Sequence, residues 1–278
     1  MFTGDYGFFD YKYNISGYSG QDFGGPAQEI YLALSAAFLM VLLFSQRGAS
    51  KDRIRKLAGY TGIFLTLLYL GKTAWETVYD VRLSGSFNTG LLPLDTCSLV
   101  MPAALLAGFG KGKARRLAES WLVTGGVVGG VGAMVQLSAF HYYPFFSFGA
   151  FYSMLWHWLM VALGLLLAAA GVVPEEDGPF HSPLGSRTVL RGYGFHLLFS
   201  LVVIPVDFLF DFDFMMYRYL GGIPLFEDLA AKFTDAGLWF LNPPLMLLLY
   251  LLAFQLVWLL LWTSTHLLRR RKPARLPA

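Results

Sequence analysis

Charged residues are scarce in this sequence, and cysteine is almost absent. Charged side chains make up 14% of the 278 residues, against about 25% in soluble domains, which excludes an ordinary soluble globular protein. The one cysteine, Cys97, cannot form an intramolecular disulfide, so cysteine usage indicates no redox compartment. The chain also lacks HExxH, GxSxG, Walker and GxGxxG motifs in a suitable setting, which removes the usual grounds for a metalloprotease, a serine hydrolase or a nucleotide-binding protein.

Long apolar runs fill most of the chain instead. Hydrophobic residues account for 56% and aromatic residues for 17% of the sequence, and a membrane-spanning helix needs about 20 mostly apolar residues. We therefore predict an all-α, polytopic bundle of seven transmembrane helices with no separate soluble domain. The predicted spans are residues 27–46, 57–79, 91–109, 117–139, 148–173, 190–212 and 242–267.

Basic residues are distributed unevenly between the two sides of this bundle. With seven spans, sixteen of the 21 lysines and arginines fall on one side, in residues 47–56, 111–116, 187–191 and 269–275, and four fall on the other. Cytoplasmic loops carry the excess of Lys and Arg in membrane proteins. The asymmetry predicts an extracytoplasmic N-terminus, a cytoplasmic C-terminus and residence in the cytoplasmic (plasma) membrane.

Three segments of the chain lie outside the seven predicted spans. Residues 1–26 are acidic and aromatic and form an extracytoplasmic N-terminal segment, without the basic-then-apolar pattern of a cleaved signal peptide. Within the domain, which covers residues 27–267, the longest outer connection is 213–241. Apolar residues at helical spacing in this connection predict a short amphipathic helix in the membrane interface. Residues 268–278 form a basic cytoplasmic tail.

Polar and ionisable side chains occur at similar depths in several predicted spans. At about 1.5 Å of rise per residue, the thiol, the imidazole and the deepest carboxylate lie roughly 8–13 Å below the outer boundary. Each charge at membrane depth costs a few kcal/mol, so a layer of this kind predicts a functional site. The layer consists of Cys97, His157, Asp207, Asp95, Glu76, Lys72 and Gln136.

These groups favour nucleophilic catalysis by a cysteine–histidine pair. His157 would accept the proton of Cys97, and Asp207 would orient the imidazole or balance its charge. Acyl transfer also needs a group that stabilises the oxyanion. Lys72, Gln136 and the free N–H groups at the start of the third span are candidates for that role, and the sequence does not choose between them.

Each of these residues also has a purely structural interpretation. Cys97 would then be a small buried hydrophobic residue, and His157 a buried histidine bonded to a neighbouring helix. Lys72 and Glu76 are four residues apart and would form an ion pair within one helix. Asp207 would bond backbone groups freed by the proline two residues before it.

Short motifs in a set order resemble a known membrane family. They are Leu92-Pro-Leu-Asp-Thr-Cys-Ser-Leu, a glycine-rich fourth span with Gln136, Leu-Trp-His-Trp around His157, and Val206-Asp-Phe-Leu-Phe-Asp-Phe-Asp-Phe-Met-Met-Tyr. Over roughly residues 60–260 the chain resembles the YwaF-type bacterial integral membrane family, which is similar to the eukaryotic transmembrane protein 164 group. Asp95 stands where the family pattern has a histidine, and Asp207 and Asp213 stand where asparagines are usual.

The resemblance implies an activity. The eukaryotic group is regarded as a cysteine-dependent phospholipid acyltransferase, which implies Cys97 as the acyl acceptor and His157 as the base. A membrane phospholipid or lysophospholipid would be the substrate of such a transferase, or of a lipid acyl hydrolase. We expect no cofactor, no metal and no nucleic-acid partner. The alternative is a non-catalytic seven-helix carrier or sensor, in which the polar layer binds a ligand or conducts protons and Cys97 only packs.

Overall fold

The computed structural model describes residues 7–11, 25–136, 143–173, 186–220 and 224–270, and this part of the chain forms helices and turns without any strand. The prediction of an all-α protein is therefore confirmed for the described residues. In chain order the elements are α1 (Pro26–Ser45), α2 (Lys51–Ser84), the 3-10 turns η2 (Thr89–Leu91) and η3 (Thr96–Leu99), α3 (Val100–Phe109), α4 (Gly112–Trp121), the π-helical turn η4 (Leu122–Gly126), α5 (Val127–Val135), α6 (Phe148–Ala169), α7 (Arg187–Phe210), the 3-10 turn η6 (Phe214–Met216), α8 (Pro224–Asp235), the 3-10 turn η7 (Trp239–Leu241) and α9 (Asn242–Arg270).

Six helical segments in the described residues are long and apolar enough to cross a membrane. They are Pro26–Ser45, Thr89–Phe109, Gly112–Val135, Phe148–Ala169, Arg187–Phe210 and Trp239–Ser264. Helix α2, which contains the second predicted span, is not among them. A multi-pass membrane protein follows from these segments, whereas the seventh span and the orientation of the two ends stay predictions.

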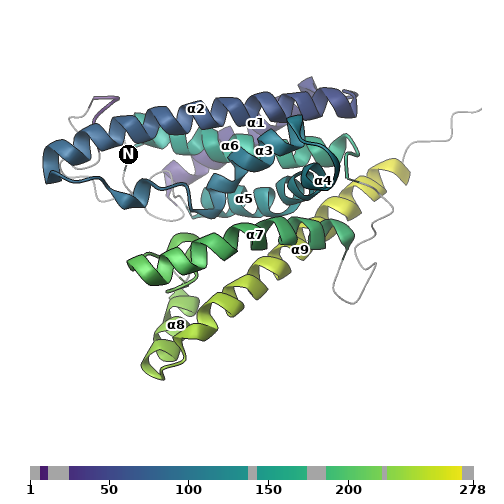
Figure 1. Ribbon diagram of the computed structural model, residues 1–278. Helices are drawn as coiled ribbons and strands as arrows, with labels where there is room; N and C mark the ends of the chain where they lie inside the picture. The colour runs from purple at the N-terminus through teal and green to yellow at the C-terminus, as the bar shows by residue number, and fades with distance from the viewer. Residues whose placement is uncertain (1–6, 12–24, 137–142, 174–185, 221–223, 271–278) are drawn as a thin grey trace, which may run out of the picture.

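Helix α2 lies antiparallel to α3, and glycines let the two backbones approach closely (Figure 1). A Cβ atom added to Gly108 would lie 2.3 Å from the Cα of Gly59, and one added to Gly62 would lie 2.8 Å from a backbone nitrogen of α3. Farther along α2, the hydroxyl of Tyr69 donates to the carbonyl oxygen of Leu91. Early residues of α2 thus pair with late residues of the neighbouring apolar segment, and α2 accompanies that segment along its length.

This close contact gives a first testable prediction. Gly108→Ala is expected to lower the free energy of unfolding by about 1–3 kcal/mol, because the added methyl group forces two packed helices apart. Gly71→Ala on α2 is the matched control, because nothing lies within 4 Å of the added Cβ and alanine favours a helix by up to about 1 kcal/mol. Thermal unfolding in detergent measures both. Equal melting temperatures for the two variants would contradict the contact.

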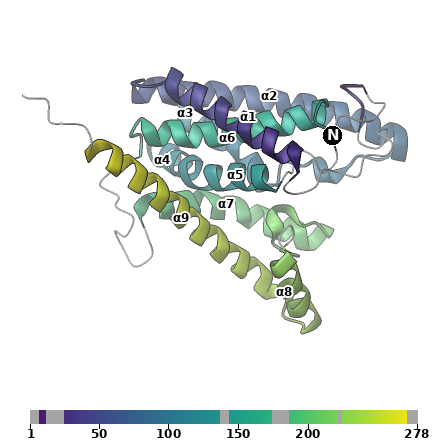
Figure 2. The same cartoon turned by 180° about the vertical axis from the view of Figure 1, so that it is seen from behind.

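The helix that runs from α4 through η4 to α5 occupies the middle of the bundle (Figures 1 and 2). All five residues of its π-helical turn are buried. Its glycines face neighbouring helices: a Cβ on Gly125 would lie 2.5 Å from the ring of Phe254 in α9, and one on Gly130 would lie 2.4 Å from Val161 in α6. These glycines therefore allow close packing inside the bundle.

Helices α7 and α9 cross obliquely on one side of this central helix, and α8 lies near the amino-terminal end of α9 (Figures 1 and 2). Helix α8 falls within the 213–241 connection, where the sequence predicts an amphipathic helix. Ala230 is buried, whereas Glu227 and Lys232 are exposed. The helix thus has one apolar side and one charged side, as the sequence pattern predicts.

Residues 211–220, which we call the returning segment, turn back along α7 after that helix ends. The N–H of Phe214 donates to Oδ1 of Asp207 at 2.9 Å, and the hydroxyl of Tyr217 lies 2.5 Å from Oγ of Ser200. Ser200 precedes the end of α7 by ten residues, or about 15 Å of helix. The segment therefore inserts a tyrosine deep between the helices. Four of its non-glycine residues have positive φ, which L-residues rarely adopt: Asp211, Met215, Met216 and Leu220.

Residues 7–11 pack against the ends of α2 and α6. Tyr11 is fully buried, its hydroxyl donates to Oδ1 of Asp80 at 2.6 Å, and its ring stacks on Tyr79. The carbonyl oxygen of Phe8 accepts a hydrogen bond from the N–H of Phe148, the first residue of α6, at 2.7 Å. This contact satisfies one of the free donors at the start of that helix.

Candidate functional site

Cys97 lies in an irregular stretch of backbone before α3, rather than in the first turn of a regular α-helix. The sequence predicts that Pro93 starts the helix, but α3 begins at Val100 and Cys97 is in the 3-10 turn η3. Leu92 has ψ of 141°, because the proline that follows disfavours the helical conformation of the residue before it. Asp95 is also extended, with ψ of 154°, and its side chain caps nothing.

The surroundings of Cys97 combine packing with nearby charge. The side chain is partly buried against the apolar core, and Nε1 of Trp156 donates to the carbonyl oxygen of Cys97 at 3.2 Å. The charges of Asp95 and Lys72 lie within electrostatic range of the sulfur. The structure therefore brings Cys97, Asp95 and Lys72 of the predicted layer together.

His157 is buried in α6, on a different face from Trp156. One residue along an α-helix is about 100° of rotation. Nδ1 of His157 lies 2.7 Å from the carbonyl oxygen of Ser153 and 3.4 Å from its hydroxyl. Among the described residues, no hydrogen bond joins the imidazole to Cys97. Met154 and Val161, one turn away on α6, pack in the apolar cluster that also contains Tyr31 of α1.

Asp207 is fully buried near the end of α7. Its Oδ1 accepts the N–H of Phe214, whereas its Oδ2 is buried without a hydrogen-bond partner in the described part of the chain. Asp95, Asp213 and Arg218 lie within electrostatic range of the carboxyl group. Asp207 thus holds the returning segment in place, which agrees with the structural interpretation that it bonds backbone groups, although those groups belong to the segment after α7.

Lys72 and Glu76 form an ion pair within α2, as the alternative interpretation of the sequence predicts. Glu76 is buried and also accepts a hydrogen bond from the hydroxyl of Tyr143 at 3.1 Å. The ammonium of Lys72 lies 5.3 Å from the ring centre of Tyr152 in α6. Gln136 ends α5 with an exposed side chain. Lys72 is therefore the better of the two side chains for stabilising charge near Cys97.

A second polar cluster, which sequence reasoning missed, joins α7, α9 and the returning segment. The hydroxyl of Tyr217 lies 3.1 Å from Nε2 of His196 and 2.5 Å from Oγ of Ser200. The hydroxyl of Tyr250 donates to the carbonyl oxygen of Met215 at 3.3 Å and lies 2.7 Å from Oγ1 of Thr96. The cluster thus reaches the residue next to Cys97.

The sequence does contain a signal for this cluster. A buried tyrosine hydroxyl usually finds a polar partner, and Tyr250 lies within an apolar span. The residues around Tyr217 are mostly apolar and aromatic although they fall outside every predicted span. An apolar connection of this kind indicates burial, because an exposed connection is normally polar.

The arrangement provides a partly buried thiol at the irregular end of an apolar helix, with the carboxylate of Asp95 and the ammonium of Lys72 within electrostatic range. The described residues contain no group of three or more His, Cys, Asp or Glu side chains that could hold a metal ion. A thiol of this kind can attack a carbonyl group as a nucleophile.

A comparison with protein-family models gives one match, to the TMEM164 family, over residues 23–266. This range contains every residue of the predicted polar layer. Neither the comparison with curated proteins nor the comparison with solved structures gives a match.

Proposed function

The chain belongs to the TMEM164 family, and from this premise we propose that it is a membrane-embedded acyltransferase that moves fatty acyl chains between phospholipid and lysophospholipid through Cys97. The observation that carries the proposal is the position of Cys97, partly buried at the irregular start of α3 with Lys72 and Asp95 in electrostatic range. Lys72 is the positive charge within electrostatic range of the thiol, and a positive charge stabilises an oxyanion.

We further propose that α2 is a seventh span. Helix α2 packs alongside the apolar segment Thr89–Phe109, with contacts at both of its ends, Gly108 and Leu91. A membrane that surrounds this segment therefore also surrounds α2. Its 34 residues correspond to about 51 Å, more than the roughly 30 Å of a bilayer core. The ion pair of Lys72 with the buried Glu76 lowers the cost of the two charges within the membrane.

With seven spans, the two ends of the chain lie on opposite sides. Three of the four basic runs meet at one end of the bundle, where Arg55, Arg115, Arg116 and Arg191 line one pocket. Their clustering supports a cytoplasmic location for that end. Cys97 then belongs to the outer half of the bundle, and the protein resides in the cytoplasmic membrane with its N-terminus outside.

The proposed reaction has two steps. The sulfur of Cys97 attacks an ester carbonyl of a phospholipid while the thiol proton moves to Nε2 of His157. The carbon–oxygen bond to glycerol then breaks, the glycerol oxygen takes the proton from His157, and a thioester remains on Cys97. In the second step a hydroxyl of another lysophospholipid attacks the thioester, its proton passes to His157, and the sulfur leaves and is protonated again. Water in place of the lysophospholipid would give hydrolysis.

The hydrogen bonds of His157 support its role as the proton acceptor. Nδ1 donates to the carbonyl oxygen of Ser153, which leaves Nε2 as the nitrogen with a free lone pair. The reaction requires the thiol and Nε2 to meet within about 3.5 Å, and a rotation of either side chain changes their separation. Asp207 is held by the returning segment, so we assign it the positioning of that segment rather than a contact with His157.

A labelling experiment tests the proposal. Purified full-length protein is incubated with a phospholipid whose acyl chain is radiolabelled, and we expect a labelled adduct on Cys97 that hydroxylamine removes, because hydroxylamine cleaves thioesters. Cys97→Ala should form no adduct, and added lysophospholipid should chase the label into phospholipid. A parent protein that forms no adduct, or an adduct that survives in Cys97→Ala, would contradict the proposal.

One observation favours the second candidate function, a non-catalytic carrier or sensor. His157 is hydrogen-bonded to Ser153 of its own helix, whereas Asp95 and Asp207 lie within electrostatic range of one another. In that case Cys97→Ser would be silent, and Asp95→Asn and Asp207→Asn would abolish ligand binding or proton movement in liposomes. The acyltransferase predicts the opposite order of sensitivity.

A further inference from the structure

The turn that carries Cys97 makes few hydrogen bonds of its own. Leu92 and Asp95, which precede it, have extended backbone conformations, and the side chain of Asp95 caps nothing. Within the turn the N–H of Ser98 donates to the carbonyl oxygen of Asp95 at 2.9 Å. From outside, Nε1 of Trp156 donates to the carbonyl oxygen of Cys97. The position of the turn therefore depends on side chains that reach it from other helices.

Thr96, the residue before Cys97, ties this turn to α9. Its Oγ1 lies 2.7 Å from the hydroxyl oxygen of Tyr250. Its methyl group faces α5, where a Cβ added to Gly129 would lie 3.7 Å from it. A β-branched side chain has restricted rotation, so a shift of the Thr96 hydroxyl also moves the backbone beside the sulfur.

The hydroxyl of Tyr250 bonds two segments of the chain at once. It donates to the carbonyl oxygen of Met215, in the returning segment, at 3.3 Å. A tyrosine hydroxyl carries one proton but can also accept a hydrogen bond. The proton in the 2.7 Å contact therefore comes from Thr96, and Tyr250 accepts it. One oxygen atom thus joins the Cys97 turn to the returning segment.

The ring of Tyr250 is fixed by packing on both sides. The side chain is buried in α9, and its ring centre lies 4.3 Å from that of His196 and 6.2 Å from that of Phe254. Phe254 is itself fully buried, and a Cβ added to Gly125 of the central helix would lie 2.5 Å from its ring. Protein interiors are close-packed, so these contacts hold the Tyr250 hydroxyl in one place.

We propose that Tyr250 is a positioning residue for the reaction at Cys97, and that it acts through Thr96 to fix the place of the sulfur. The inference rests on the proposed acyl transfer. A displacement of about 1 Å can cost about 10²-fold in rate. Tyr250 holds the turn rather than the lipid, so loss of its hydroxyl lowers kcat and leaves KM nearly unchanged.

Steady-state turnover of labelled phospholipid by the detergent-solubilised full-length protein tests this role. Tyr250→Phe keeps the ring, and we expect kcat to fall about 10–100-fold while KM changes less than about twofold. Thr96→Val keeps the shape of the side chain without its hydroxyl and should have the same effect. Thr96→Ser retains the hydroxyl and should keep most of kcat. The double variant of Tyr250→Phe with Thr96→Val should lose no more than either single variant, because both remove one bond.

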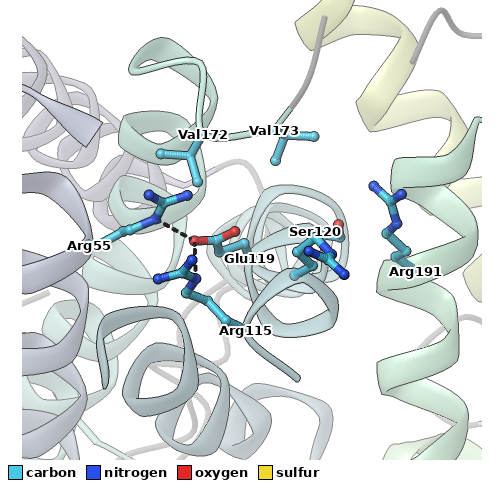
Figure 3. A pocket seen from close by; sticks show the side chains of 8 residues that line it. Arg55, Arg115, Glu119, Ser120, Val172, Val173 and Arg191 are labelled. Carbon is cyan, nitrogen blue, oxygen red and sulfur yellow. Dashed lines mark hydrogen bonds and ion pairs between the residues drawn. The ribbon is translucent and has the colours of Figure 1, made fainter. Parts of the chain in front are cut away.

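Two control variants separate positioning from a general loss of stability. Tyr217→Phe removes another buried hydroxyl of the same cluster, one that bonds to α7 rather than to the turn. Arg55→Gln breaks the ion pair with Glu119 (Figure 3), and Arg55 lies beside Gly108, at the opposite end of α3 from the turn. Both should lower the melting temperature by a few degrees, as Tyr250→Phe does, yet change kcat less than about twofold. An equal fall of kcat in all three variants would contradict the positioning role.

A second measurement does not depend on lipid chemistry. Cys97 is the only cysteine of the chain, so N-ethylmaleimide modifies a single thiol, and mass spectrometry follows the rate in the folded protein. Tyr250→Phe and Thr96→Val should each raise this rate at least about threefold, because a released turn exposes its thiol more often. Their double variant should raise it no further, and Tyr217→Phe should leave it unchanged.

The two measurements distinguish failure of the inference from failure of the proposed activity. If the parent protein turns over no lipid but alkylation follows the expected pattern, Tyr250 holds the turn and the acyltransferase is wrong. If turnover requires Cys97 while Tyr250→Phe and Thr96→Val keep the parent values of kcat and alkylation rate, the activity stands and the positioning role is wrong. Parent-like alkylation of both variants in a protein without turnover overturns both.

Discussion

Cys97→Ala is expected to abolish lipid acyl turnover, with a fall in kcat/KM of at least about 10³-fold, because no other group can carry the acyl chain. The variant should still fold. The backbone at this position is held by Trp156, whose indole N–H donates to the carbonyl oxygen of residue 97, and by the N–H of Ser98, which donates to Asp95. Neither contact uses the thiol. Turnover of labelled phospholipid and thermal unfolding, measured on the same preparation, check both parts.

Histidine variants test the second half of the same prediction. His157→Gln should reduce turnover by about 10²–10⁴-fold, the usual contribution of a general base, and should slow formation of the thioester. His196→Gln is the comparison, because His196 is also a buried histidine but bonds to Tyr217. If His196→Gln removes turnover in a folded protein while His157→Gln does not, the proton acceptor has been assigned wrongly. Full turnover in Cys97→Ala would remove the acyltransferase altogether.

Tyr217→Ala is expected to lower the free energy of unfolding by about 3–5 kcal/mol, which is the usual cost of removing a buried aromatic ring. The ring is fully buried, and its hydroxyl serves both His196 and Ser200. The returning segment also contains Met215, Met216 and Leu220 at positive φ, a conformation that costs about 1–2 kcal/mol per residue. Contacts such as those of Tyr217 must offset this cost. We therefore expect the whole segment to detach once the ring is gone.

Two further variants make this prediction specific. Tyr217→Phe keeps the ring and removes only the hydroxyl, so it should cost about 1–3 kcal/mol, the penalty for leaving buried partners unsatisfied. Tyr219→Phe removes a hydroxyl that bonds to Asp211 at the exposed surface and should change stability by less than about 0.5 kcal/mol. Limited proteolysis of residues 211–220 reports detachment directly. Resistance to proteolysis in Tyr217→Ala equal to that of the parent would contradict the role of the ring.

The helices were predictable because length and apolarity are local properties. Each predicted span contains or overlaps a helix of the structure, and the ion pair of Lys72 and Glu76 follows from their spacing alone. The gathering of basic runs was also predictable, because alternate connections of a bundle share one side. Arg55, Arg116 and Arg191 are far apart in sequence and line one pocket.

The parts that failed depend on backbone conformation. Pro93 is compatible with the start of a helix, but it also disfavours the helical conformation of Leu92. In the structure Leu92 is extended, so the second effect decides the conformation there. The sequence therefore placed Cys97 in a regular turn that does not form. The returning segment could not be derived either, because its turns rely on positive φ at methionine and leucine rather than at glycine, and such turns depend on tertiary contacts.

The site is predicted less completely than the fold. Depth along each span groups Cys97 with Lys72 and Asp95, and the charges of these two residues lie within electrostatic range of the sulfur. Depth says nothing about rotation of a helix about its axis, and rotation decides which side chains face each other. His157 bonds to its own helix, and Trp156, one residue earlier, is the side chain that contacts Cys97. The pairing of Cys97 with His157 stays a prediction.

The docking of residues 7–11 bears on how the protein should be handled in the laboratory. The hydroxyl of Tyr11 donates a hydrogen bond to Asp80, its ring stacks on Tyr79 of α2, and the carbonyl oxygen of Phe8 accepts from the first N–H of α6. An expression strategy that removes residues 7–11 would remove these contacts with α2 and α6. Affinity handles and reporter fusions are therefore better attached to the carboxyl end.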